Sequence, residues 1–304
     1  MKAWATVRIF TVLLLCAGAG AACADDAGAN SVATLQASYR ALGNQLSDNQ
    51  FRRPIHLNSS ETPDSVTGNV YALVNHQFAS VGAALNNPDN WCDVLILHIN
   101  TKYCRASAAA SGSILNVSIG KKSYQPLDEA YGMTFGYHVV THTPTYLQVR
   151  LNAKEGPLST HNYRIVLEAM LLKSGQTFIR LSYSYVYGLA GWLAMQTYLG
   201  TIGSQKVGFT VVGKGADGQP LHVSGMRGLV ERNTMRYYLA IEAFLGALSV
   251  PPQARLEKSL RDWFATIESY PRQLHELKQG EYLDMKRREY RRQQAGLRVI
   301  DSSL

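Results

Sequence analysis

The sequence has few cysteines, few charged residues and no long hydrophobic run. Of its 304 residues only 17% are charged and 4 are cysteine. The hydrophobic fraction of 46% excludes intrinsic disorder, which needs low hydrophobicity and high net charge. So few cysteines in a chain of this length exclude a small disulfide-stapled scaffold. No stretch reaches the roughly 18 uninterrupted apolar residues of a membrane-spanning helix. The apolar residues must therefore be buried in a core or around a cavity.

Common catalytic motifs are also missing. The sequence contains no Gly-x-Ser-x-Gly elbow, no His-Glu-x-x-His helix and no glycine-rich phosphate loop. His138 and His142 have the spacing of zinc ligands on one helix face, but their surroundings predict strand and turn, and no third ligand is near. We therefore predict no catalytic residue, no metal site and no cofactor.

Residues 1–24 have the pattern of a secretory signal peptide. A basic N-terminal part precedes an apolar stretch over residues 9–17, and Ala22-Cys23-Ala24 is a small-x-small cleavage site. A retained anchor is the alternative. Lipidation of Cys23 is disfavoured because the residue three positions earlier is glycine where a lipoprotein signal has leucine. We expect cleavage after Ala24 and a bacterial protein that is periplasmic or secreted.

Only Cys92 and Cys104 remain once this leader is removed. An export compartment favours oxidation, so we expect these two residues to form a disulfide. In the chain-entropy model, closing so short an interval stabilises a fold by about 3 kcal/mol. Two buried thiols are the alternative.

Hydrophobic periodicity changes twice along the chain. Helical spacing near the N-terminus gives way to alternation typical of strands, and helical spacing returns after residue 229. Two β-rich runs around a short glycine-containing connection, at 173–176 and again at 214–218, predict two hairpins. The expected elements are helices over 31–47, 78–85, 90–95 and from 230 onward, and strands over 70–74, 96–104, 114–119, 133–139, 147–151, 163–172, 177–187, 207–212 and 221–223.

One stretch carries a family resemblance. From Val70 to Leu97 the chain reads VYALVNHQFASVGAALNNPDNWCDVLIL, which places Phe78, Pro88 and Trp91 after the first strand. This order of a strand, two short helices, an antiparallel meander and C-terminal helices resembles the START/Bet v 1-like (helix-grip, SRPBCC) superfamily. The resemblance implies an α+β fold in which a curved antiparallel sheet grips a long C-terminal helix and encloses a cavity for an apolar ligand.

The chain departs from this pattern in its extra helices and in an apolar insertion at 188–206. We expect a signal peptide over 1–24, an N-terminal helix over 25–50, a helix-grip domain over 51–270 and a basic helical tail over 271–304. The tail predicts a solvated amphipathic helix, with transient membrane-surface contact as the second interpretation. No nucleic-acid partner is expected of an exported protein.

Aromatic residues alternate along the strand that ends at Tyr187. Large side chains fall on one face of this strand, and a tyrosine ring offers an apolar surface with a polar tip. An ordinary packed core is the alternative to a cavity. Arg232 and Arg236 could meet an anionic ligand head, although pairing with Glu231 or a sheet carboxylate is favoured. The residues expected to line the cavity are Phe135, Tyr137, Tyr183, Tyr185, Tyr187, Arg232 and Tyr238.

Taken together, the residues favour an exported protein that binds or transports an apolar ligand, such as a lipid, sterol or hopanoid-like molecule. An enzyme of the cyclase or hydrolase type is the alternative on the same scaffold. It would require His98, Lys102, His138 or Glu168 to point into the cavity. A structural envelope protein, the third interpretation, predicts a packed core and an exposed apolar patch instead.

Overall fold

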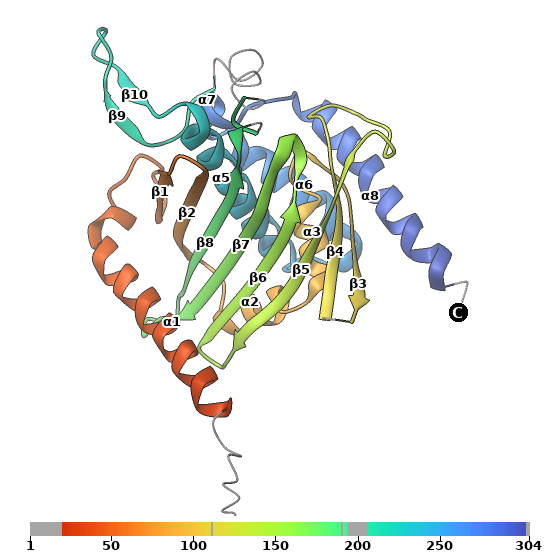
Figure 1. Cartoon of the computed structure of the whole chain (residues 1–304), viewed down its shortest axis with the longest axis horizontal. Helices are drawn as coiled ribbons and strands as arrows, with labels where there is room; N and C mark the ends of the chain where they lie inside the picture. Colours follow the sequence, from red (N-terminus) through yellow and green to blue (C-terminus); the bar gives the residue numbers. More distant parts are fainter. Residues whose placement is uncertain (1–19, 111, 190, 194–205, 302–304) are drawn as a thin grey trace, which may run out of the picture.

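The computed structural model describes residues 20–110, 112–189, 191–193 and 206–301 (Figure 1). Most of the expected leader lies outside these ranges. An eight-stranded antiparallel sheet runs in the order β1-β2-β8-β7-β6-β5-β4-β3. The strands are β1 Ile55–Glu61, β2 Ser65–Val74, β3 Thr101–Ala109, β4 Gly112–Ile119, β5 Tyr131–His142, β6 Tyr146–Glu155, β7 Thr160–Leu171 and β8 Thr177–Tyr187, with a separate hairpin of β9 Val211–Lys214 and β10 Pro220–His222.

Helices cover both faces of this sheet (Figure 1). The α-helices are α1 Gly20–Leu42, α2 Phe78–Leu85, α3 Pro88–Leu95, α5 Gly225–Ala247, α6 Pro252–Ile267, α7 Pro271–Leu274 and α8 Gln279–Asp301, with 3-10 turns at Gly43–Leu46 and Pro157–Ser159. In the described part of the chain, no helix is both long and apolar enough to cross a membrane.

The connectivity defines the fold class. The first long strand, β2, pairs antiparallel with the last, β8, so the meander from β3 to β8 returns to its start. Two short helices follow β2, and the long helix α5 follows the sheet and contacts β1, β2 and β8. This is the helix-grip, or Bet v 1-like, arrangement, and the predicted α+β fold class is confirmed.

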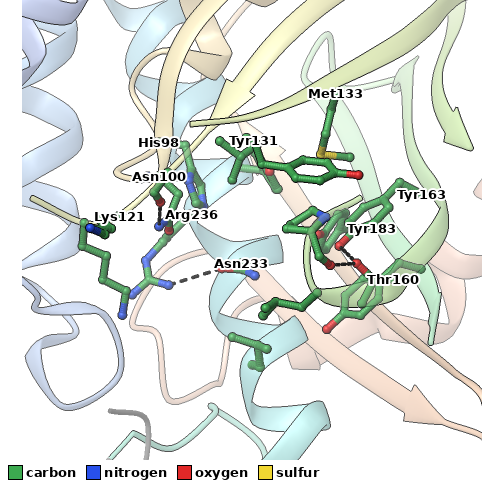
Figure 2. Close-up of a pocket in the computed structure, with 18 of the residues that line it drawn as sticks. His98, Asn100, Lys121, Tyr131, Met133, Thr160, Tyr163, Tyr183, Asn233 and Arg236 are labelled. Carbon is green, nitrogen blue, oxygen red and sulfur yellow. Dashed lines mark hydrogen bonds between the residues drawn. The ribbon is translucent and has the colours of Figure 1, made fainter. Parts of the chain in front are cut away.

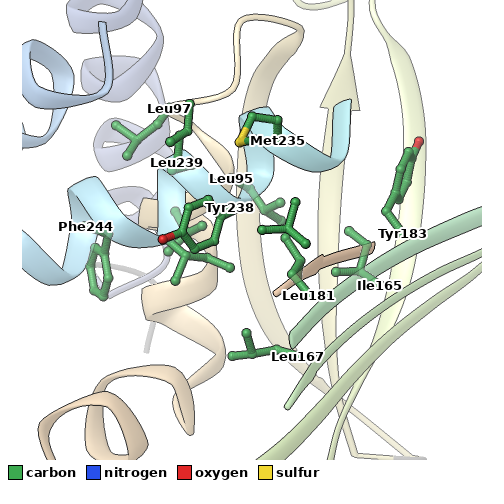
Figure 3. Packing of buried hydrophobic residues seen from close by; sticks show 14 of the residues in the cluster. Leu95, Leu97, Ile165, Leu167, Leu181, Tyr183, Met235, Tyr238, Leu239 and Phe244 are labelled. Carbon is green, nitrogen blue, oxygen red and sulfur yellow. The ribbon is translucent and has the colours of Figure 1, made fainter. Parts of the chain in front are cut away.

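Helix α5 crosses β2 at very short range. A Cβ atom on Gly68 would lie 2.4 Å from Oγ1 of Thr234, so only glycine leaves room for the helix there. The C-terminal half of α5 then fills the core. Its residues Tyr238 and Leu239 lie in one buried cluster with Leu167 of β7 and Leu181 of β8 (Figure 3).

The two short helices connect the sheet to this core. Asn87 caps α3 by accepting a hydrogen bond from the amide of Asp89, and the indole of Trp91 donates to the carbonyl of Leu85 at 2.9 Å. Cys92 of α3 forms a disulfide with Cys104 of β3. The expected disulfide is therefore present, and it fastens α3 to an edge strand of the sheet.

The opposite face of the sheet carries α1. A second, smaller cluster joins Leu35 of α1 to Tyr146, Met170 and Phe178 of three neighbouring strands. Phe178 and Ile179 belong to different clusters because adjacent strand residues point to opposite faces. The predicted N-terminal helix is thus a packed layer of the fold.

The strand prediction was wrong in three places. Residues 207–210, expected to form a strand, are irregular, and β9 begins only at Val211. Residues 55–61 form the edge strand β1, which was not expected because polar residues dominate its outer half. Residues 96–100 form turns after α3, and the strand expected from 96 begins at Thr101. The mainly apolar run from Val94 to Ile99 is buried throughout. It therefore shows no periodic pattern from which helix, turn and strand could be distinguished.

The C-terminal basic segment packs against the body of the protein. Lys286 and Glu289 of α8 are fully buried beside β3. Arg287 forms a bidentate pair with Glu257 of α6, and Arg292 donates to the carbonyl of Lys102. These basic side chains therefore bind the protein itself.

Candidate functional site

A cavity of about 560 Å³ lies between the first half of α5 and the sheet. Its volume falls in the range typical of small-molecule sites, and aromatic and apolar side chains form much of its wall. The sheet contributes Tyr131, Met133, Phe135, Thr160, Tyr163, Tyr183 and Tyr185, and the 3-10 turn before β7 contributes Pro157 and Leu158.

Helix α5 supplies the opposite wall with a single face. The lining residues of α5 are spaced by three and four positions, which places them in one stripe along the helix. They are Leu229, Arg232, Asn233, Arg236 and Tyr237. The cavity lies beside this mainly polar stripe. In the C-terminal half of α5, apolar side chains such as Leu239 and Phe244 are packed into the core instead.

The third wall is the irregular segment between β4 and β5. It contributes Gly120, Lys121, Lys122, Gln125 and Glu129 to the lining, next to Ile119 at the end of β4. Gln125 is buried and holds the segment in shape, because it accepts from the amide of Lys121 and donates to the carbonyl of Glu129, both at 2.7 Å. Lys121, Glu129 and Tyr131 are exposed in part and form the rim of the cavity.

Tyrosines stack around the apolar end. The rings of Tyr163 and Tyr185 stack with centroids 5.1 Å apart, and Tyr183 meets Tyr237 of α5 edge-on at 5.3 Å. Burial raises the pKa of Tyr163 to about 12 and raises the pKa of Tyr183 well above its ordinary value, so these hydroxyls remain neutral at physiological pH. This end offers flat apolar surface with a few hydroxyl groups.

Cationic and polar groups gather at the other end of the cavity. Figure 2 shows His98, Asn100, Lys121 and Arg236 on one side, the aromatic residues on the other, and Asn233 between them. Arg236 pairs with Glu276 at 2.7 Å and also donates to the carbonyl of Leu274. These contacts fix the guanidinium at the cavity wall.

His98 is held as a neutral imidazole. Burial lowers its pKa well below the ordinary value, and the charges of Arg236, Lys286, Lys122 and Lys102 lower it further. Its Nδ1 accepts from the amide of Asn100 at 3.2 Å, which places the ring proton on Nε2. Among the described residues Nε2 finds no hydrogen-bond partner.

Four of the seven residues that the sequence placed in the cavity line it in the structure. Phe135, Tyr183, Tyr185 and Arg232 are part of the lining. Three further tyrosines lie outside it: Tyr137 donates to the carbonyl of Leu85, Tyr187 to Glu61 and the carbonyl of Thr62, and Tyr238 to Glu242. Strand alternation identifies the inner face of a sheet but not the depth at which a cavity lies along it, so it could not separate these tyrosines from the lining. Ligand binding by the lining residues stays a prediction.

One of the candidate catalytic residues named from the sequence lies at the cavity. The enzyme interpretation requires at least one of four residues to point into the cavity, and of these four His98 lines it. Lys102 is paired with Glu289, His138 is exposed, and Glu168 binds Tyr146 and Arg180 on the face covered by α1. Within the ranges that the structure describes, no group of three or more His, Cys, Asp or Glu side chains could hold a metal ion.

Sequence reasoning missed the wall between β4 and β5. Residues 120–129 have no regular period, so periodicity gave no reason to place them at the site. The pair of adjacent lysines, Lys121 and Lys122, was the signal that the sequence offered.

No protein-family model and no curated protein sequence matches the chain. Solved structures with limited similarity include truncated norcoclaurine synthase from Thalictrum flavum, at 11% identity over 48% of this chain and 91% of that chain, with a TM-score of 0.33. Ara h 8.0201 matches at 7% identity over 64% and 99% of the two chains, with a TM-score of 0.31. A conserved protein of unknown function from Enterococcus faecalis, EF2215, matches at 11% over 47% and 75%, with a TM-score of 0.27. The fold assignment rests on strand order and connectivity, and these values add nothing about ligand or activity.

Proposed function

We propose that this protein binds an apolar or amphipathic small molecule in the cavity beneath α5. The observation that carries the proposal is the hollow of about 560 Å³, walled by aromatic residues at one end. Burial of a ligand there would contribute about 25 cal/mol per Å² of apolar area removed from water. Hydroxyl and charged groups at the wall would set its orientation. The structural-envelope interpretation predicts a packed core instead.

We further propose that the protein acts after export to a bacterial periplasm, where it would carry a lipid, sterol or hopanoid-like molecule. The leader pattern supports export, and the disulfide between Cys92 and Cys104 suits an oxidising compartment. Membrane contact through α8 receives less support, because the packing of its basic side chains against the protein leaves less charge for a lipid surface. We propose no enzymatic function.

A fluorescence titration tests the binding site. N-phenyl-1-naphthylamine is a neutral aromatic probe that fits the chemistry of the tyrosine wall, and we expect saturable binding at one site. Leu229→Trp places a larger side chain into the cavity and should weaken binding at least tenfold. Leu221→Trp, on the exposed β10 strand, is the matched control and should leave the affinity unchanged.

Two results would overturn the proposal. The first is the absence of saturable binding to the unmodified protein. The second is equal affinity in the Leu229→Trp and Leu221→Trp variants when both unfold as cooperatively as the parent protein.

A further inference from the structure

We infer that the ligand is an amphipathic anion, whose acidic head lies against the cationic end of the cavity and whose apolar part lies against the tyrosines. This inference rests on the proposed function and names the chemical class of its ligand. It follows from the unequal chemistry of the two ends of one continuous cavity.

Positive charge is in excess at the cationic end. Lys121, Lys122, Arg232 and Arg236 line the cavity, whereas Glu129 is the lining carboxylate. Buried or half-buried cations are costly to hold without negative charge nearby. A ligand that brings an anionic head would lower this cost.

One carboxylate of the protein, Glu276, already pairs with two of these four cations. Glu276, in the connection between α7 and α8, lies 2.7 Å from both Lys122 and Arg236 and 4.0 Å from Lys206. Burial opposes its ionisation, but Arg236 and Lys122 still hold its pKa below the ordinary value. Three cations therefore lie within 4.0 Å of the same carboxylate, and the formal charges of this group of four side chains sum to a positive value.

The electrostatic potential at Lys206 and at His98 is also positive. Burial lowers the pKa of Lys206, and repulsion from Lys122, Arg236 and Arg232 lowers it further despite the attraction of Glu276. The nearby cations act on His98 in the same direction. An anion placed among these groups would be attracted by all of them.

His98 and Asn100 add hydrogen-bonding capacity at the same end. The neutral imidazole stacks on Tyr237 with centroids 4.6 Å apart, so it stands where the polar and aromatic walls meet. Its Nε2 proton has no acceptor among the described residues. Hydrogen bonds to a charged acceptor are stronger than those to a neutral one, which favours a carboxylate, phosphate or sulfonate over an alcohol.

A matched pair of probes tests the inference. 1-Anilinonaphthalene-8-sulfonate has the aromatic frame of N-phenyl-1-naphthylamine plus a sulfonate. We expect the anion to bind at least fivefold more tightly at low salt, and to lose most of this advantage when NaCl is raised from 0.05 to 0.5 M. The neutral probe should change little, because salt screens charge and not apolar burial.

Variants assign the effect to the cationic end. Lys122→Gln keeps a hydrogen-bond donor but removes a charge, and should reduce the preference for the anion about threefold. Lys173→Gln, in the exposed turn between β7 and β8, changes the net charge equally and should leave the preference intact. Displacement of N-phenyl-1-naphthylamine by dodecanoate and by dodecyl phosphate then distinguishes a carboxylate head from a phosphate head, with dodecanol as the neutral comparison.

Each failure has its own signature. If neither probe binds, the proposed function fails together with the inference. If both probes bind in the cavity with equal affinity, or if dodecanol displaces as well as both anions, the function stands and the anionic class is wrong. If Leu229→Trp does not weaken the sulfonate probe, that probe binds elsewhere and the inference is overturned.

Discussion

The carboxylate of Glu289 in α8 lies 3.0 Å from the ammonium of Lys102 in β3, and both side chains are fully buried. The second carboxylate oxygen of Glu289 lies 2.8 Å from Lys286. The two lysines in turn donate to carbonyls of His98, Thr101 and Ser123, in segments that lead into the cavity wall. Helix α8 therefore anchors the polar end of the candidate site through one buried carboxylate.

Glu289→Gln should destabilise the protein strongly. It leaves two buried ammonium groups without their shared counter-ion, and removing one partner from such an arrangement costs about 3–5 kcal/mol. Urea unfolding at pH 7 measures this loss. Glu281→Gln, on an exposed position of the same helix, is the control and should change the free energy of unfolding by less than about 1 kcal/mol. Equal effects of the two substitutions would show that the buried cluster has no special role.

Protonation of His98 should lower stability at acidic pH. Its pKa is lowered in the folded protein, so below pH 6.5 the unfolded chain takes up a proton that the folded chain does not. The free energy of unfolding therefore falls as pH falls, by at most about 1.4 kcal/mol per pH unit for this one group. His98→Asn should show a shallower decline below pH 6.5.

Exposed His138 provides the comparison for this experiment, and His138→Asn should retain the slope of the parent protein. Burial raises the pKa of Asp93 to about 6, which acts with the opposite sign but equally in all three proteins. Parallel pH profiles for His98→Asn and the parent would contradict the assignment.

The disulfide between Cys92 and Cys104 should contribute about 3 kcal/mol to stability, because it closes a short loop and restricts the unfolded chain. We expect the double variant Cys92→Ala/Cys104→Ala to have a correspondingly lower free energy of unfolding in non-reducing buffer. Adding dithiothreitol should destabilise the parent and leave the double variant unchanged. A parent protein insensitive to complete reduction would contradict this expectation.

Expression with the native N-terminus in a bacterial host tests the export proposal. Mass spectrometry of the periplasmic fraction should find a chain that begins at Asp25. Replacement of Ala22 and Ala24 by Leu should block cleavage, because signal peptidase requires small residues at these positions. A full-length chain confined to the cytoplasm would refute export.

The helix-grip order could be predicted from the sequence because its signals are local. The hairpin at Lys173–Gln176 has Gly175 at a φ of 84°, a conformation that glycine adopts without strain. The alternation from Ile179 to Tyr187 identified the inner face of β8, and every second residue of that run is buried. Phe78 and Trp91 marked the two short helices in their correct places.

The limits of the cavity could not be predicted, because they depend on what lies across the interior. Tyr185 faces the hollow, whereas Tyr187, two residues on, reaches Glu61 at the end of the sheet. The burial of Lys286 could not be predicted either, because a lysine among other basic residues is typical of a solvated helix. Its partner Glu289 and the carbonyls that it binds come together only in the folded chain.

A crystal structure of the protein with N-phenyl-1-naphthylamine tests the central claim most directly, because it locates the ligand. We predict one molecule between Tyr185, Tyr183 and Leu229, with its aromatic rings away from Arg236. Ligand bound only outside the cavity, or a cavity that stays free of ligand at saturating concentration, would contradict the account.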